Sequence, residues 1–185
     1  HMSARIRLAQ PADAAAIAHV HVETWRAAYA GVVPDSYLVR MSEQGQALTW
    51  RKLLARRSKD ERTVVAEVEK GEGETKTLVG FGSYGRQRGT ELGYTGEIFT
   101  LYVLPDWQGQ DIGQQLMHAT FKRLWEAGTP DCLVWVLAEN PARFFYERMG
   151  GQRVAERIES FAGENLTQIA YGWPDLEAWL QQTGG

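Results

Sequence analysis

The segment over residues 104–117 constrains the fold most strongly, and it reads LPDWQGQDIGQQLM. The apolar residues before it predict a strand over residues 96–104, which a proline ends. The apolar arc after it predicts an amphipathic helix over residues 109–127. Gly109 and Gly113 stand where a Ser or Thr cap is common, which indicates a backbone that approaches an anion closely.

The backbone N–H groups of residues 109–114 are the candidate anion donors. The first N–H groups of a helix have no intrahelical acceptor, and they lie at the positive end of the helix dipole. Free donors that directly follow a strand make an anion site. The alternative is an ordinary strand-to-helix turn, and this segment alone leaves both interpretations open.

The order of the predicted elements indicates one mixed α/β (α+β) domain. Strands are predicted over residues 6–9, 62–69, 77–84, 96–104, 132–137, 153–161 and 166–172, and helices over residues 11–29, 42–57, 109–127, 141–149 and from 175. The segment KGEGETK makes a hairpin of the second and third strands, so the front half is antiparallel, whereas the back half reads strand–helix–strand. We expect one mixed sheet flanked by helices, in a single domain over residues 5–185, with residues 1–4 as a tag remnant and disordered start.

Composition narrows the class of protein. The chain has 185 residues, 44% apolar and 23% charged, as expected for one globular domain. Its formal net charge of -3 does not favour nucleic acid as a partner. We find neither a signal peptide nor an apolar run of about 20 residues, so we expect no membrane contact and a cytoplasmic location. The single cysteine, Cys132, lies in an apolar run and is predicted to be a buried core thiol.

Two histidines invite a metal-site interpretation. His19 and His21 are two residues apart on a predicted helix, so they point to nearly opposite sides. We therefore expect surface or packing roles and no metal.

The strand, the turn and the helix together resemble the GNAT superfamily of acetyl-CoA-dependent N-acetyltransferases. The family signature is Q/R-x-x-G-x-G/A after the fourth strand, and Gln108-Gly109-Gln110-Asp111-Ile112-Gly113 is similar to it at both ends. The resemblance extends over most of the chain. It implies a sheet of about seven strands, mostly antiparallel and splayed between the fourth and fifth strands, and it implies that the anion is the pyrophosphate of coenzyme A.

The same resemblance implies a set of cofactor-binding residues. They are Leu101, Tyr102 and Val103 on the strand, residues Gln108, Gly109, Gln110, Asp111, Ile112, Gly113 and Gln114 at the turn, and Asn140. The strand residues would offer backbone groups to the pantetheine arm and one N–H to the thioester oxygen, which stabilises developing negative charge. Acetyl-CoA is the implied co-substrate, with no metal and no covalent enzyme intermediate.

Asp111 departs from the family pattern, which usually has glycine there. Asp tolerates left-handed backbone angles better than most residues, and its carboxylate could cap the helix. A carboxylate about 4 Å from a phosphate costs ~1 kcal/mol in water. We expect Asp111 to point to solvent and to weaken cofactor binding only modestly.

A second segment, N-P-A-R-F-F-Y-E-R-M-G from Asn140, resembles the family pattern N-x-x-A-x-x-F-Y-E-x-x-G. The resemblance implies that Tyr146 is the general acid; the alternative is a core aromatic on the apolar face of a helix. A phenol stays protonated at neutral pH and can donate to a departing thiolate. The family has Phe where this chain has Gly151, which predicts looser packing there.

Glu97 is the candidate base. Strand alternation predicts that Glu97, Phe99, Leu101 and Val103 share one side of the strand. Similar enzymes carry a base glutamate at this spacing, acting directly or through water; the alternative is a surface charge at the strand end.

The acceptor is expected to be a primary amine of a small molecule. In similar proteins the first helix and the last hairpin line the acceptor pocket, here with Trp25, Tyr29 and Phe161. Aromatic rings would suit a cationic amine, although each residue could instead be packing. Two alternatives are a protein N-terminal or lysine acetyltransferase and a non-catalytic acyl-CoA sensor. A homodimer is possible.

Overall fold

The protein is described by a computed structural model, which covers residues 4–56, 61–69, 71, 73, 75–89 and 91–183. The predicted tag remnant at residues 1–4 lies outside these residues except for Ala4. Parts of the predicted hairpin turn at residues 70–76 and the predicted helix end at residue 57 lie outside them as well.

The described chain forms a seven-stranded sheet in the order β1-β2-β3-β4-β5-β7-β6. The strands are β1 (Arg5–Leu8), β2 (Glu61–Glu69), β3 (Lys76–Arg86), β4 (Gly96–Val103), β5 (Cys132–Leu137), β6 (Gln152–Phe161) and β7 (Glu164–Trp173). Every pair of neighbours is antiparallel except β4 and β5. The predicted mixed, mostly antiparallel sheet is confirmed.

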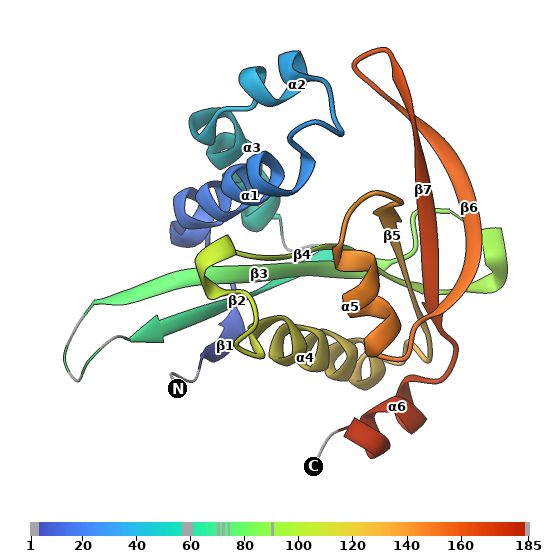
Figure 1. Ribbon diagram of the computed structural model, residues 1–185. Coiled ribbons are helices and arrows are strands. Elements are labelled where there is room, and N and C mark those ends of the chain that lie inside the picture. The colour runs from blue at the N-terminus through green and yellow to red at the C-terminus, as the bar shows by residue number, and fades with distance from the viewer. Residues whose placement is uncertain are drawn as a thin grey trace.

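Helices cover both faces of the sheet. They are α1 (Ala14–Tyr29), α2 (Asp35–Arg40), α3 (Glu43–Ala55), α4 (Ile112–Glu126), α5 (Ala142–Arg148) and α6 (Leu176–Thr183), with short 3-10 turns η1 (Pro11–Asp13), η2 (Glu91–Gly93) and η3 (Pro105–Trp107). Helices α1, α2 and α3 lie on one side, whereas α4 lies on the other with α6 below it (Figure 1). Within the described residues, no helix combines the length and the apolar character that a membrane span requires.

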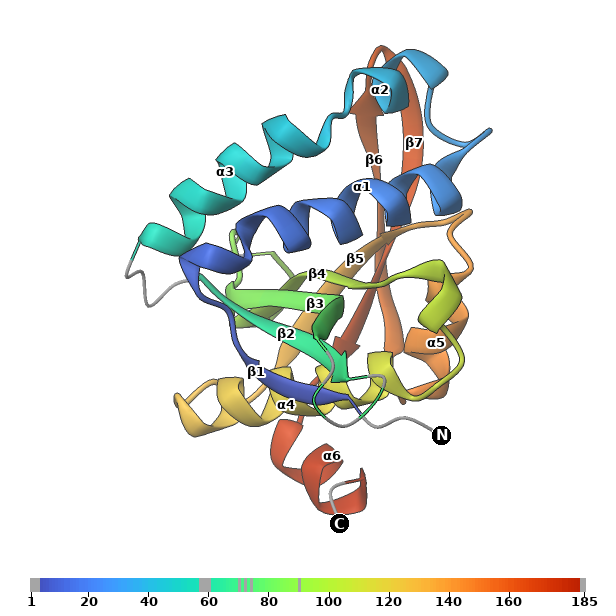
Figure 2. The same cartoon turned by 90° about the vertical axis from the view of Figure 1, so that its left-hand side faces the viewer.

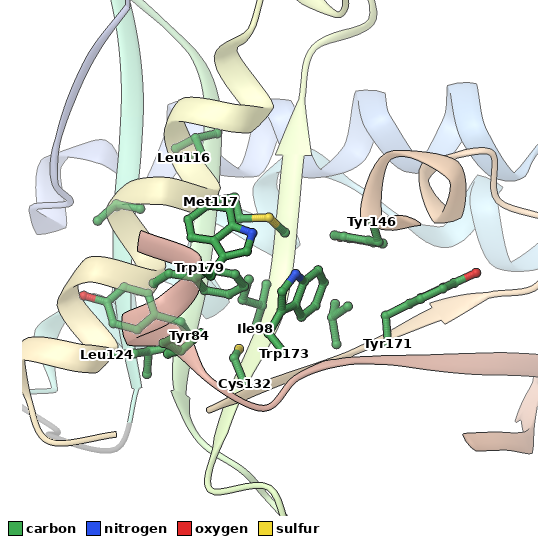
Figure 3. Close-up of a cluster of buried hydrophobic side chains, with 14 of the residues drawn as sticks. Tyr84, Ile98, Leu116, Met117, Leu124, Cys132, Tyr146, Tyr171, Trp173 and Trp179 are labelled. Carbon is green, nitrogen blue, oxygen red and sulfur yellow. The ribbon is translucent and has the colours of Figure 1, made fainter. Parts of the chain in front are cut away.

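Each face of the sheet has its own core. Helix α4 packs Leu116, Met117 and Phe121, all without exposed surface, against the sheet and against Trp173 and Trp179 (Figure 3). On the opposite face, α1 and α3 bury Ile17 and Trp50 against Phe81. Burial of such side chains contributes about 1.5–3 kcal/mol each, so these two clusters fix the helices to the sheet.

Strands β4 and β5 pair over a very short distance. Their parallel ladder consists of Glu97 with Leu133 and Ile98 with Val134, while β4 continues to Val103 and β5 to Leu137. The splay that the resemblance implied between the fourth and fifth strands is therefore present, and past the ladder the two strands run in different directions (Figure 2).

A β-bulge in β4 changes which side Glu97 faces. Ser83 pairs with Thr100 and Tyr84 pairs with Ile98, so Phe99 is the extra residue. Ile98 consequently packs in the same cluster as Leu101 and Val103, on the α4 face. The prediction that Glu97 shares a side with Leu101 and Val103 is wrong, because one inserted residue reverses the alternation.

Two other expectations need correction. The loop predicted between the first two helices contains the helix α2, Asp35–Arg40. Helix α4 begins at Ile112 rather than at residue 109, because Gly109 and Asp111 adopt left-handed angles, with φ of 80° and 66°.

The hairpin between β6 and β7 turns through Ala162 and Gly163, both with positive φ, as a tight two-residue turn requires.

Candidate active site

A cavity of about 1130 Å³ opens where β4 and β5 part. Its lining comes from the end of β4, the end of β5, the start of α4, the helix α5 and the inner side of α1. Past Ile98, β4 has β3 on one side and no ladder to β5 on the other, so its backbone groups on that side have no strand partner, and within the described chain only the Val103 carbonyl among them accepts a bond, from the Gln108 side chain. Leu101, Tyr102 and Val103, the strand residues predicted to bind the cofactor, all line the cavity.

The start of α4 offers backbone donors to the same cavity. The first intrahelical bond runs from the Gln115 N–H to the Asp111 carbonyl at 3.0 Å, so the N–H groups of residues 112–114 precede it. Gly109 has open space around its Cα, since a Cβ there would meet no atom within 4 Å. These features fit the phosphate groups of a nucleotide-like thioester.

The side chains of this turn divide between cavity and core. Gln108, Gly109, Asp111, Gly113 and Gln114 line the cavity. Ile112 is buried in the α4 core, and Gln110 is half-buried outside the lining, so these two offer backbone groups alone. The Gln108 amide donates to the carbonyl of Val103 at 3.1 Å and thereby ties the turn to the end of β4.

Asp111 is exposed and adopts the left-handed conformation that we expected it to tolerate. Its carboxylate makes no capping hydrogen bond, so the suggestion that it caps the helix is wrong. Gly113 faces the ring of Phe145, where an added Cβ would lie at 3.5 Å, an ordinary contact. Packing against the sheet therefore does not require glycine at this position.

Tyr146 lies on α5 with 5% of its surface exposed, and it lines the cavity. Its ring packs near Tyr171 and Trp173 (Figure 3), so the core-aromatic and cavity-lining descriptions both apply. Burial, and to a lesser degree the neighbouring Tyr29, raises the pKa of the phenol above its usual range. The phenol is therefore protonated at neutral pH, as a proton donor must be.

The position after the α5 turn is tightly packed. A Cβ on Gly151 would lie 2.7 Å from the Trp173 ring and 3.0 Å from the Tyr146 carbonyl oxygen. The looser packing predicted at Gly151 is wrong, because the indole of Trp173 fills the space.

Asn140 connects α5 to α1. Its side-chain oxygen accepts from the Ala142 N–H at 2.9 Å, and its amide donates to the Tyr29 hydroxyl at 2.7 Å. Burial raises the pKa of Tyr29 to about 12, so this phenol also stays neutral. Asn140 lines the cavity and holds two of its walls together.

Glu97 lies in a second cavity of about 410 Å³. The residue is 5% exposed, and its carboxylate accepts from the Arg88 backbone N–H at 3.3 Å and from the Arg88 guanidinium at 3.5 Å. Trp135, Phe161 and Gln168 line both cavities, so the two adjoin. Glu97 is thus a buried carboxylate beside the large cavity, rather than the surface charge of the alternative interpretation.

Four aromatic residues close the end of the large cavity away from α4. The Trp25 ring lies 4.5 Å from Tyr29, 5.8 Å from Tyr37 and 6.1 Å from Phe161 between ring centroids. Its indole N–H donates to the Tyr102 hydroxyl at 3.0 Å. The predicted residues Trp25, Tyr29 and Phe161 therefore meet on one wall, although they come from α1 and from the tip of β6.

Sequence reasoning missed several lining residues. His21, Thr24, Trp135 and Gln168 line the large cavity. His21 and Thr24 precede and adjoin Trp25 on one helix, and their three-residue spacing places them on a shared face. That spacing could have indicated His21 and Thr24 as lining residues from the sequence.

The other candidates lie outside the cavity. His19 points away from His21, as predicted, and sits on the exposed surface 2.5 Å from Glu43, with ligand atoms of His19, Glu23 and Glu43 within 4.8 Å of one another. Cys132 has no exposed surface, and burial raises the pKa of its thiol well above the usual range, which confirms a core thiol.

Comparisons with known proteins agree with this geometry. The family model described as the acetyltransferase (GNAT) domain matches residues 59–150. YuaI of Bacillus subtilis (strain 168), which is named an N-acetyltransferase, is 34% identical over 173 residues, 94% of each chain.

Solved structures share the fold. The structure of yncA from Salmonella typhimurium with acetyl-CoA has a TM-score of 0.68 at 22% identity and covers 93% of this chain and 94% of that one. The PaiA N-acetyltransferase of Thermoplasma acidophilum, in complex with coenzyme A, has a TM-score of 0.59 at 20% identity, over 91% and 98% of the chains.

Fold and family together define the class of protein. The chain belongs to the GNAT family of acetyltransferases. It is an acetyl-CoA-dependent acyltransferase, and the family resemblance drawn from the two sequence motifs is confirmed.

Proposed function

We propose that this enzyme transfers the acetyl group of acetyl-CoA to a primary amine of a small molecule. The observation that carries the proposal is the single cavity that runs from the free N–H groups of α4, past Tyr146, to the aromatic wall of α1. A cavity wall of clustered aromatic rings suits a small acceptor better than a protein chain, for which a long open groove would be needed.

In the proposed complex, acetyl-CoA supplies the activated acetyl group along the open edge of β4. Backbone groups of Leu101, Tyr102 and Val103 hold the pantetheine arm, and one of their N–H groups donates to the thioester oxygen. The N–H groups of residues 109–114 bind the pyrophosphate, and Asn140 positions the wall opposite.

Tyr146 donates its proton to the thiolate when the carbon–sulfur bond breaks. Glu97 accepts one proton of the acceptor ammonium, the resulting amine attacks the thioester carbon, and the acetylated nitrogen loses its second proton to the Tyr146 phenolate. Because Glu97 lies in the adjoining cavity, we propose that a water relay through the shared lining of Trp135 and Gln168 connects it to the amine. Trp25, Tyr29 and Phe161 surround the acceptor.

The test is thiol release from acetyl-CoA with a panel of primary amines, with a Lys-containing peptide and a free N-terminal peptide as alternative acceptors. We expect turnover with small amines and little with peptides. Faster turnover of either peptide would favour a protein acetyltransferase. Acetyl-CoA binding without thiol release for any acceptor would favour the sensor.

A further inference from the structure

The hydroxyl of Thr24 is a buried polar group with an unusual environment. Thr24 is 8% exposed, and among the described residues its Oγ1 has no hydrogen-bond partner. It lines the large cavity on α1, beside Trp25. A buried hydroxyl without a partner costs about 1–3 kcal/mol, so a ligand that supplies the partner gains correspondingly.

Other helical threonines of this chain use their hydroxyls differently. Thr49, Thr120 and Thr183 each donate to the carbonyl four residues earlier, at 3.2, 2.8 and 2.8 Å. This local bond is the usual way for a threonine inside a helix to satisfy its hydroxyl. Thr24 does not make it, although it lies well inside α1. Its hydroxyl is therefore available to the cavity.

His21 adds a second donor one turn earlier on the same face of α1. Its Nδ1 accepts from the Trp50 indole N–H at 3.3 Å, which places the ring proton on Nε2. Burial lowers the pKa of His21 to about 4, so the ring is neutral at pH 7. The wall thus offers a neutral N–H donor next to a hydroxyl.

The end of the cavity that Thr24 and His21 line has no charged side chain in its lining. Among the residues that line the cavity, the charged ones are Asp111 and Arg148, which belong to the α4 and α5 end. Beyond α1 the lining continues through Tyr37 on α2, Met41 just after α2 and Gln46 on α3, all uncharged. A charged group buried here would lose its hydration without a counter-charge, which is costly.

We propose that Thr24 and His21 bind an uncharged hydrogen-bonding group, such as a hydroxyl or a carboxamide, at the end of the acceptor remote from its amine. This inference rests on the proposed function, because it describes the acceptor of that reaction. It assigns the acceptor class: primary amines with a neutral polar tail, and not diamines or polyamines.

The experiment uses primary amines that differ at the far end alone, with four to six carbons: an alkylamine, the corresponding amino alcohol, the amino carboxamide and the diamine. Thiol release from acetyl-CoA gives kcat and KM for each. For the wild-type enzyme we expect the alcohol or the amide to have the highest kcat/KM. Thr24→Val should lower that value about five- to tenfold, mainly through KM, and leave the alkylamine unchanged. Thr24→Ser should retain the preference.

Stability is measured on the same variants. Thr24→Val removes an unpaired buried hydroxyl, so its melting temperature should equal or exceed that of the wild type. The matched control is Thr49→Val, on the exposed side of α3, which should leave every kinetic constant unchanged. A lower melting temperature of Thr24→Val with unchanged kinetics would mean that the hydroxyl serves the fold, and it would overturn the inference.

Two further outcomes separate this inference from the proposed function. Equal or better turnover of the diamine or the alkylamine overturns the inference and leaves the proposed function standing. Absence of thiol release with every amine overturns the proposed function, and calorimetric binding of the amino alcohol to the coenzyme A complex then decides the inference. Binding that Thr24→Val weakens supports the site, and binding that it does not change refutes it.

Discussion

At the scale of single residues, the backbone angle of Asp111 matters more than its charge. The residue has φ of 66° immediately before α4, and the chain enters the helix at Ile112. Asp is one of the few residues besides glycine that adopt this angle readily. The exposed carboxylate is screened by water and salt.

We expect Asp111→Gly to bind acetyl-CoA more tightly than the wild type, by less than about tenfold, since one screened carboxylate near a phosphate costs ~1 kcal/mol. Calorimetry at low and physiological salt measures the change. Asp111→Asn removes the charge and keeps the size of the side chain, and it should increase the affinity for acetyl-CoA by a similar factor. A gain above tenfold would show that the carboxylate lies against the phosphates.

Tyr146→Phe should reduce kcat by about 10²–10⁴, because a positioned general acid contributes that much. Its KM for acetyl-CoA and its melting temperature should change little, since the Tyr146 hydroxyl bonds to no other described residue. Tyr171→Phe is the matched control: this ring lies 6.2 Å from that of Tyr146, but its hydroxyl donates to Glu147. Full activity of Tyr146→Phe would remove the acid assignment.

Gly151→Ala should destabilise the fold by about 1–3 kcal/mol, the usual cost of overpacking a filled site. The new methyl group would clash with Trp173 and with the Tyr146 carbonyl. Urea unfolding measures the change. Gly89→Ala, where a Cβ meets no atom within 4 Å, serves as the control. Equal stability of both variants would contradict the packing described here.

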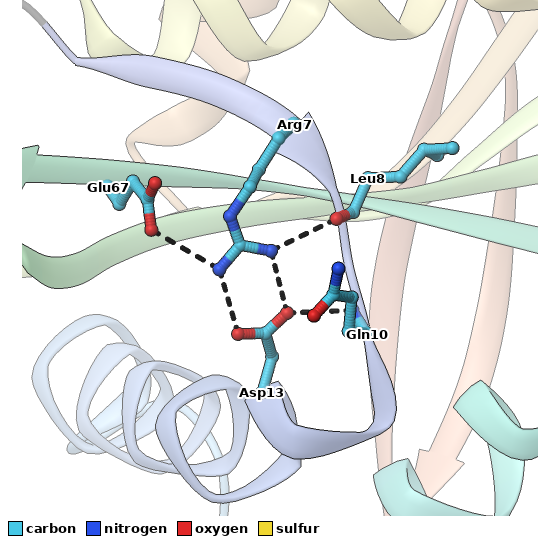
Figure 4. Close-up of polar contacts among 5 residues, drawn as sticks. All are labelled: Arg7, Leu8, Gln10, Asp13 and Glu67. Atoms are coloured by element: carbon cyan, nitrogen blue, oxygen red, sulfur yellow. Dashed lines mark hydrogen bonds and ion pairs between the residues drawn. The ribbon is translucent and has the colours of Figure 1, made fainter.

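At the scale of secondary-structure elements, a charged network joins the start of the chain to the sheet. The Arg7 guanidinium of β1 forms two bonds to Asp13, both at 2.9 Å, and one to Glu67 of β2 at 3.2 Å (Figure 4). Asp13 also accepts from the Gln10 N–H at 2.7 Å. The turn before α1 is thereby held against the first two strands.

The bond to Arg7 lowers the pKa of Asp13 in the folded state. The pair therefore stabilises the fold at pH values above the unfolded pKa of about 3.9, and the stabilisation is lost as the pH falls through the lower folded pKa. We expect Asp13→Asn to cost about 1–3 kcal/mol at pH 7 and progressively less below pH 4. Urea unfolding across this range measures the effect, and Asp106→Asn, at an exposed site, is the control. A cost independent of pH would contradict the ion pair.

Periodicity and turn residues predicted most elements, since these signals are local. The strand Cys132–Leu137 and the end of α1 at Tyr29 coincide with their predictions. The bulge at Phe99 and the helix α2 were not predicted from the sequence, because both depend on partners distant in sequence. The bulge in turn moved Glu97 to the other face of β4, which alternation alone could not reveal.

At the scale of the whole molecule, the sequence could indicate which segments bind but not how their walls meet. The two family motifs fall at the same cavity, as the resemblance implied. The contact between Asn140 and Tyr29 joins residues 111 positions apart, and the shared wall of the two cavities depends on β6 and β7 returning beside β5. Such long-range approaches follow from the sheet order, which no short segment specifies.

The two-residue ladder between β4 and β5 makes the sheet two half-sheets with a weak seam. Native-state hydrogen exchange should reveal this seam as the fastest-opening part of the sheet, and saturating coenzyme A should slow exchange at residues 99–103. Unchanged exchange there would contradict binding along that edge. In such a protein, a co-substrate that binds along the seam contacts both half-sheets. It thereby couples their local opening motions, which are independent in its absence.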